Sequence, residues 1–399
     1  MKNKKSNKGI TLVALVITII ILLILATISV QSLTNTGLFK KAQEAKNAME
    51  KAEEEQQLML NEYEEELNKY SGTDKEEKDP IKEVANKVLS TTDNTELTDA
   101  YGNKIVVPAG FKIKVDETTN NATTVNQGIV IVDSEKKEFV WIPVGKIYTD
   151  ASKSDANAKT IELGRYEFDE SGVKSAYSGG YVEEDKGDTT TTLKNYGNTI
   201  AKSITDFKTS VATNGGYYIG RYEARTTTAR SDAEDTLTTI TEKGTDKVYN
   251  YVTQPQAATL AQNMYNSNKF TSDLMNSYAW DTATVFLQTC GTNATYSRQT
   301  SVNTTLSQTG TNTQETKDVQ CNVYDMASNV VEWTTETSSM SDLDIPCIAR
   351  GKFSISSSFM SYRTAVDEYG SLEGLGYKYS AAGDKDFGFR PLLYVGLNS

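Results

Sequence analysis

The sequence contains no histidine among its 399 residues, only three cysteines and only six prolines. The lack of histidine excludes Ser-His-Asp and Cys-His catalysis, imidazole-ligated zinc or iron, and histidine as a general base near neutral pH. Cys290, Cys321 and Cys347 form no CxxC pair, which excludes a zinc ribbon and a disulfide-dense scaffold. At most one internal disulfide can form. Cys321 and Cys347 are either such a pair or separate buried thiols.

Basic residues are also scarce relative to acidic ones. Lysine and arginine together number 41 against 53 aspartates and glutamates, which gives a formal charge of −12. Because contacts to phosphates need a surplus of lysine and arginine, we expect no nucleic-acid partner. The length exceeds that of a typical single domain, so we expect a core of normal size and at least one further module.

The N-terminus carries a long apolar run. Residues 1–9, MKNKKSNKG, contain four lysines and no acid, and residues 10–30 contain no charge. A run of about 20 apolar residues can span a bilayer, and lysines in front of it are expected to stay in the cytoplasm. The pattern predicts a membrane-spanning segment over residues 10–36 with the rest of the chain outside. An ordinary signal peptide is the alternative.

The sequence after this run favours a continued helix. Proline is absent from residues 1–79, and the less polar side chains of residues 37–70 recur at spacings of three, four and seven. These spacings predict an amphipathic helical stalk. The charged stretch at 71–80, SGTDKEEKDP, ends in Pro80 and predicts a linker. Residues 81–399 then form a head.

The N-terminal part resembles the type IV prepilins and the related pseudopilins of secretion machines. The resemblance rests on the basic leader ending in Gly9, on Ile10 after it, and on an apolar helix that becomes amphipathic. It implies cleavage by prepilin peptidase after Gly9, N-methylation of Ile10, and contacts with the membrane and other pilin subunits through the helix. The fifth mature position, usually glutamate in the family, is Ala14, which favours a minor or tip subunit over a major pilin.

The head shows mixed secondary-structure signals. Two apolar runs at 128–132 and 138–144 flank a polar turn and predict a hairpin. Two helices are predicted at 254–266 and 271–287. Residues 150–215 are polar and predict long loops with a short helix near 200–210. This order predicts an α+β fold with high loop content, preceded by the long N-terminal helix.

Several short strings in the head occur in the order found in one family: GYYIGRYEA at 216–224, MNSYAWD at 275–281, YDMASNVVEWT at 324–334, Arg350-Gly351 and Gly388-Phe389-Arg390. They resemble the formylglycine-generating enzymes, or sulfatase-modifying factors. The resemblance covers about residues 100–397 and implies a C-type lectin-like fold. It also implies that Asn329 and Glu332 match positions that can bind calcium, and a hydrogen-bonded turn is the alternative for them. No other cofactor is expected.

Catalysis in this family needs a reactive cysteine pair in the segment after the Arg-Gly motif. Here that segment reads RGKFSISSSFMSYRTAVDEYGS and contains no cysteine. A thiolate is both the copper ligand and the reactive group, and no other side chain replaces it well. We therefore expect that the protein is not an enzyme.

The same segment is rich in tyrosine and serine. Tyrosine supplies contact area at low entropic cost and serine adapts its hydrogen bonds, so this composition is typical of binding loops. In some lectin-like proteins the corresponding stretch is the variable region of a diversity-generating retroelement. A solvated loop with structural tyrosines is the alternative. The expected ligand contacts are Phe353, Ser354, Ser356, Ser357, Ser358, Met360, Tyr362, Asp367 and Tyr369.

Together these features predict a non-catalytic, adhesin-like binding protein, a minor or tip type IV pilin that recognises an unidentified protein or glycan. Its expected location is the cell membrane as a single-pass protein, then the cell surface or a pilus, with the head outside. Two alternatives are a minor pseudopilin that primes a secretion filament and a degenerate enzyme of the head family.

Overall fold

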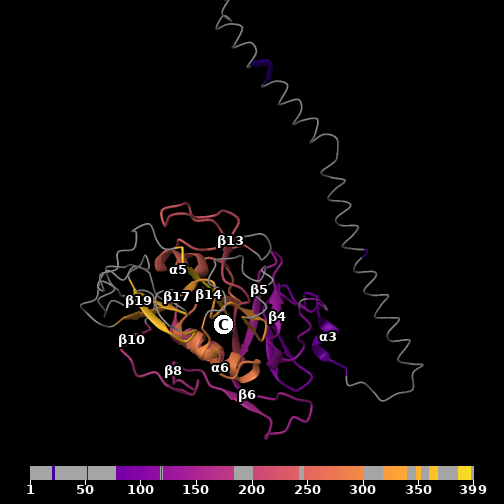
Figure 1. The fold of residues 1–399 in the computed structure, drawn as a ribbon. Coiled ribbons are helices and arrows are strands. Elements are labelled where there is room, and N and C mark those ends of the chain that lie inside the picture. Colours follow the sequence, from indigo (N-terminus) through magenta and orange to yellow (C-terminus); the bar gives the residue numbers. More distant parts are fainter. Residues whose placement is uncertain are drawn as a thin grey trace, which may run out of the picture. The chain divides into compact units, whose positions relative to one another are not determined.

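The computed structural model describes residues 20–22, 52, 78–116, 118, 120–183, 201–241, 247–300, 318–338, 347–351, 359–366 and 385–396. The chain divides into two compact units, Met1–Glu76 and Glu77–Ser399. Their boundary falls within the predicted linker at 71–80. The elements described below belong to the second unit (Figure 1).

The helices of this unit are short. They are α3 (Pro80–Val84), α4 (Ile204–Asn214), α5 (Gln254–Gln262) and α6 (Ser277–Cys290), with 3-10 turns η1 (Val125–Gln127) and η3 (Tyr296–Arg298). Each of the longer three starts after a residue whose side chain accepts a hydrogen bond from a first-turn N–H: Ser203, Thr253 and Asn276. Such caps satisfy backbone donors that have no partner within the helix.

A six-stranded antiparallel sheet forms the centre of the unit. Its strand order is β14-β21-β11-β5-β4-β3. The strands are β3 (Lys112–Ile113), β4 (Val130–Val132), β5 (Glu138–Pro143), β11 (Gly216–Gly220), β14 (Phe270–Leu274) and β21 (Pro391–Val395). All five residues of β11 and of β21 are buried. The main hydrophobic core therefore lies on this sheet and includes Trp141, Tyr217 and Trp280.

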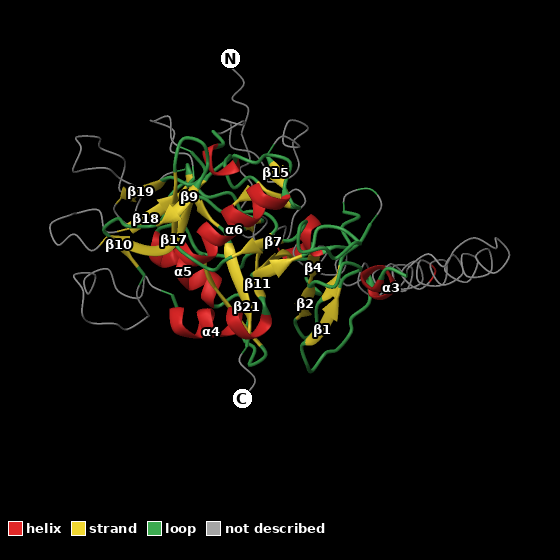
Figure 2. Ribbon diagram, turned by 90° about the horizontal axis from the view of Figure 1, so that it is seen from below, coloured by secondary structure: helices red, strands yellow, loops and turns green. Residues whose placement is uncertain are grey.

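A second sheet carries most of the candidate site. Its order is β10-β17-β18-β19 (Figure 2), and β20 pairs in parallel with β17. The strands are β10 (Tyr181–Val182), β17 (Val331–Ser338), β18 (Cys347–Arg350), β19 (Arg363–Val366) and β20 (Phe387–Phe389). A smaller core around Trp333, Phe387 and Phe389 packs against it and includes α5 residues such as Ala257.

Five small hairpins complete the described strands. They are β1 (Thr95–Thr98) with β2 (Lys104–Val107), β6 (Gly145–Ile147) with β7 (Lys159–Ile161), β8 (Tyr166–Phe168) with β9 (Lys174–Ala176), β12 (Arg225–Thr226) with β13 (Lys247–Val248), and β15 (Val319–Gln320) with β16 (Val323–Tyr324). The region predicted to be long loops at 150–215 thus contains β7, β8, β9 and β10.

The predicted fold class is wrong. Strands predominate among the described residues, and the longest helix there, α6, has 14 residues. A mainly antiparallel unit of two sheets with short helices replaces the expected α+β fold with a long N-terminal helix and a lectin-like head. The helix and stalk predicted over residues 10–70 lie outside the described residues, except Ile20–Leu22 and Ala52, which are helical.

The predicted location needs the same correction. Among the residues that the structure describes, no helix combines the length and the apolar character needed to cross a membrane. This finding overturns the expected single-pass location. The processing residues Gly9 and Ile10 lie outside the described residues, so cleavage and pilin contacts stay predictions.

Candidate functional site

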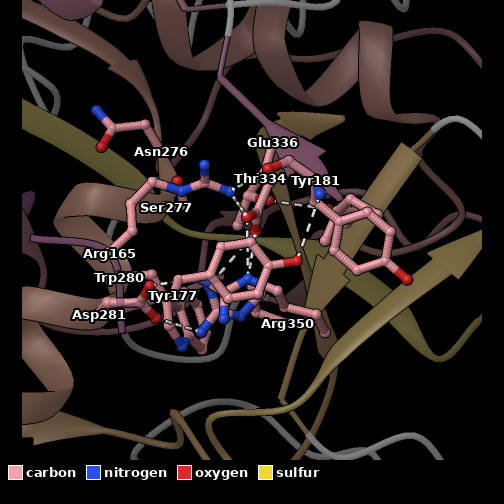
Figure 3. A network of polar contacts seen from close by, with 12 residues as sticks. Arg165, Tyr177, Tyr181, Asn276, Ser277, Trp280, Asp281, Thr334, Glu336 and Arg350 are labelled. Atoms are coloured by element: carbon pink, nitrogen blue, oxygen red, sulfur yellow. Dashed lines mark hydrogen bonds and ion pairs between the residues drawn. The ribbon is translucent and has the colours of Figure 1, made fainter. Parts of the chain in front are cut away.

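Five charged side chains from distant parts of the chain meet beside the second sheet. Arg165 precedes β8, Asp281 lies in α6, Glu336 in β17, Arg350 at the end of β18, and Arg363 at the start of β19. We call this set the ionic network. Figure 3 shows the first four of these side chains directed toward one another.

The two carboxylates of the network bind all three arginines. Asp281 Oδ1 accepts from Arg350 Nη2 and Asp281 Oδ2 from Arg363 Nη2, each at 2.5 Å. Glu336 accepts from Arg363 Nε at 2.9 and 3.0 Å and from Arg165 Nη2. The side chains of Asp281, Glu336 and Arg350 are fully buried. Buried charges persist only when partners compensate their lost hydration, and here Asp281 faces two arginines and Glu336 faces three.

The network also holds backbone at the edge of the sheet. Arg350 donates from Nε to Tyr362 O and from Nη2 to Ser361 O, both at 3.2 Å. Arg165 Nη2 donates to Tyr181 O at 2.7 Å. The same arginines that satisfy the buried acids therefore fix the backbone at Tyr362 and Tyr181.

Three tyrosines lie on this base, and we call them the tyrosine surface: Tyr177, Tyr181 and Tyr362. The guanidinium carbons of Arg363 and Arg165 are 3.9 and 4.8 Å from the Tyr177 ring centroid, within the range of cation–π attraction. Tyr177 and Tyr181 stack with centroids 6.4 Å apart at 19°. Tyr362 is 47% exposed.

The phenols of Tyr177 and Tyr181 keep their protons at neutral pH. Partial burial raises the pKa of Tyr177 and of Tyr181. The neighbouring Tyr177, Glu336 and Tyr362 raise the pKa of Tyr181 further. The surface therefore presents aromatic faces and O–H donors, and both are fixed by the ionic network.

Of the nine predicted ligand contacts, two are described. Tyr362 belongs to the tyrosine surface. Met360 is fully buried, donates its backbone N–H to Gln299 O at 3.0 Å, and accepts from the Thr284 hydroxyl through Sδ at 3.4 Å. Met360 is therefore a core residue with no exposed surface for the predicted ligand contact. The remaining seven lie outside the described residues: Phe353, Ser354, Ser356, Ser357, Ser358, Asp367 and Tyr369.

A partly buried acid next to the network was not singled out from the sequence. Glu183 follows β10, and its carboxylate accepts from Ser277 N in the first turn of α6 and from the Thr335 hydroxyl at 2.7 Å. Burial, followed by repulsion from Glu336, raises the pKa of Glu183 to about 7. This carboxyl therefore exchanges its proton near neutral pH, unlike an ordinary glutamate.

The two predicted calcium ligands have separate partners. Glu332 accepts from Arg390 Nη2 at 2.7 Å and from Arg390 Nε at 3.1 and 3.2 Å. Asn329 donates to Glu223 and has a left-handed φ of 63°. The structure thus places Glu332 in a buried ion pair and Asn329 in a tight turn. Within the described residues, no group of three or more acidic or cysteine side chains could hold a metal ion.

The three cysteines are free thiols, so the disulfide left open by the sequence is absent. Burial raises the pKa of Cys290 to about 12 and that of Cys321 further. Cys347 is fully buried in β18. A reactive cysteine needs a thiolate, which these environments disfavour.

The sequence alone did not predict most of the ionic network, because its members are far apart along the chain. Arg165 and Glu336 are 171 positions apart, and Arg350 and Asp281 are 69 apart. The string MNSYAWD contains Asp281, and Arg350-Gly351 contains Arg350, but neither string shows that the two side chains meet. Residues 334–337 of β17 are polar, which in a sequence is typical of an exposed strand, but the structure buries them.

Comparisons with models of protein families, with curated proteins and with solved structures find no match to this chain. Its function is therefore inferred from its own residues.

Proposed function

We propose that the protein is a non-catalytic binding protein that recognises a protein or glycan through the tyrosine surface. The observation that carries the proposal is the position of the Tyr177 ring. Two guanidinium groups of the largely buried ionic network contact this ring, and the exposed Tyr362 belongs to the same surface. Tyrosine and arginine are the residue types that often dominate binding energy at interfaces.

The rigidity of this base supports recognition. A side chain that is already held in one conformation loses little entropy on binding, and this improves affinity. Backbone at Tyr181 and Tyr362 is fixed by Arg165 and Arg350, and the Tyr177 ring is held by Arg165 and Arg363. The tyrosine surface is therefore organised before any ligand arrives.

The chemistry of these phenols and of the cysteine thiols supports binding without turnover. The phenols of Tyr177 and Tyr181 have raised pKa values, and the thiols of Cys290 and Cys321 do too. These groups therefore stay protonated and weakly nucleophilic at neutral pH. The predicted alternatives, a pseudopilin and a degenerate enzyme, stay predictions.

The test is a screen of the full chain against a glycan array and a phage-displayed peptide library. For any ligand found, Tyr362→Ala and Tyr177→Ala should each weaken binding by about 2 kcal/mol or more, roughly 30-fold in Kd. Tyr101→Ala is the matched control. Tyr101 lies between β1 and β2, and Figure 2 shows this hairpin on the opposite side of the unit from β10 and β19.

Two results would contradict the proposal. One is a ligand whose affinity changes equally in the Tyr101 and Tyr362 variants. The other is a ligand that binds the Tyr362→Ala and Tyr177→Ala proteins as well as it binds the unaltered protein.

A further inference from the structure

Three N–H donors at the ionic network lack an acceptor among the described residues. They are Arg165 Nε, Arg350 Nη1 and Trp280 Nε1, and each is buried. A buried donor without an acceptor costs free energy, and native proteins contain few of them. Three such donors in one place therefore require an explanation.

Two of the donors belong to arginines that share one carboxylate, and the third belongs to a tryptophan beside one of these arginines. Arg165 and Arg350 approach the same Glu336 carboxylate, where Arg165 Nη2 donates to Oε1 and Arg350 Nη1 lies 3.6 Å from Oε2. That distance is too long for a hydrogen bond. The Arg350 guanidinium carbon is 5.5 Å from the Trp280 ring centroid, and Figure 3 shows these side chains together.

The network carries a net positive charge, and this charge, like the unpaired N–H donors, favours an anion. Three arginines face two carboxylates, Asp281 and Glu336, so one positive charge is in excess. The ion pairs of the described residues do not include one between the nearby Glu183 and these arginines, and its oxygens accept from Ser277 N and from the Thr335 hydroxyl. With its pKa of about 7, Glu183 is also only partly ionised at neutral pH.

We propose that the ionic network binds a small monovalent anion of the size of chloride, which accepts from Arg165 Nε, Arg350 Nη1 and Trp280 Nε1. An anion matches the donors and the excess charge, whereas a metal cation would find neither a free acceptor nor a negative charge in these groups. The ion must be small because Arg350 and Trp280 have no exposed surface. This proposal does not depend on the proposed ligand-binding function.

The anion would strengthen the base of the tyrosine surface. Arg165 and Arg350 also hold the backbone at Tyr181 and Tyr362. An anion that satisfies both guanidinium groups would therefore stabilise the folded chain by mass action.

The test is thermal unfolding of the full chain in sodium chloride, sodium bromide or sodium gluconate at equal ionic strength. Chloride and bromide should raise the unfolding midpoint in a saturable way, by about 2–4 °C at tenfold excess over Kd, and the larger gluconate should not. Equal midpoints in all three salts would overturn the proposal.

Two tryptophans provide a matched pair of variants. Trp280→Phe removes one proposed donor and should weaken the chloride dependence several-fold in apparent Kd. Trp141→Phe is the control, because Trp141 is also fully buried with an indole N–H that has no acceptor among the described residues, but it lies in β5. Equal chloride dependence in the two variants would place the ion elsewhere and refute the site.

A crystal of the unaltered protein grown in bromide tests the site without a variant, so the result does not depend on whether a variant folds. An anomalous peak in contact with Arg350 and Trp280 is the expected result. A water molecule there, with no bromide peak, would contradict the proposal.

Discussion

Arg350 and Arg363 are direct partners across strands β18 and β19, and each donates to a different oxygen of Asp281. Two guanidinium groups in such positions repel each other. Burial, followed by repulsion from Arg363, lowers the pKa of Arg350. Asp281 of α6 and Glu336 of β17 offset this repulsion.

Replacing Asp281 tests this dependence. Asp281→Asn keeps the shape of the side chain but removes the charge that both arginines face. Since it leaves buried charge without compensation, we expect a loss of about 3–5 kcal/mol in the free energy of unfolding, measured by urea denaturation. Asp155→Asn is the control, because Asp155 pairs with Lys146 on the surface. Similar losses in the two variants would show that the network is not a special source of stability.

The raised pKa of Glu183 predicts how the free energy of unfolding depends on pH. Its pKa rises from 4.5 to about 7 on folding, so between these values the folded chain holds a proton that the unfolded chain has lost. The stabilisation that Glu183 contributes is therefore fully present below about pH 4.5. It is lost as the pH rises through 7, which lowers the free energy of unfolding by roughly 3 kcal/mol. Asp273, with a pKa raised by burial to about 6, acts in the same direction.

The measurement is urea unfolding of the protein and of Glu183→Gln between pH 5 and pH 8. The amide stays neutral, so the variant should lose less stability than the unaltered protein over this range. Glu167→Gln is the control, since Glu167 is exposed in β8. Parallel stability curves for the Glu183→Gln variant and the unaltered protein would contradict the role assigned to Glu183.

Local signals predicted the elements that depend on local sequence. The hairpin of β4 and β5 follows two apolar runs around a polar turn, and α5 begins at Gln254, as the proline after it suggested. The predicted helix at 271–287 was partly wrong. Residues Phe270–Leu274 pair with β21, more than 100 positions later in the chain, and this pairing outweighs the helical spacing.

The short helix predicted near 200–210 is found as α4, but the strands within the predicted loops at 150–215 were missed for a related reason. Strands β7 to β10 have two or three residues each, which is too short for a period of two to appear. The ionic network could not be predicted because isolated charges usually lie in solvent. Only the fold brings Glu336 of β17 and Asp281 of α6 to the same arginines.

Met360 and Tyr362 are close in sequence and should respond differently to substitution. Met360→Ala removes a fully buried side chain, so we expect a loss of about 2–5 kcal/mol in the free energy of unfolding. Tyr362→Ala should change stability by only about 0.5 kcal/mol, because its ring is 47% exposed. Urea denaturation of both variants provides the comparison. A large loss for Tyr362→Ala would show that its ring has a packing role and would weaken its assignment to binding.

Calcium should have little effect at Asn329 and Glu332. Both Glu332 oxygens accept from Arg390, so a calcium ion would have to break a buried ion pair. We expect the same thermal midpoint in calcium and in EDTA. A midpoint that rises with calcium and no longer rises in Glu332→Gln would restore the calcium site implied by the family resemblance.

The number of cysteine thiols that react with a reagent distinguishes a binding protein from an enzyme with a catalytic cysteine. Because Cys347 is fully buried and burial raises the pKa of the Cys290 and Cys321 thiols, the folded protein should react slowly with a disulfide reagent such as Ellman's reagent. In guanidinium chloride all three free thiols should react. A single reacting thiol in denaturant would reveal a disulfide. One thiol that reacts rapidly in the folded protein would indicate an activated cysteine, and this result would reopen the enzymatic alternative.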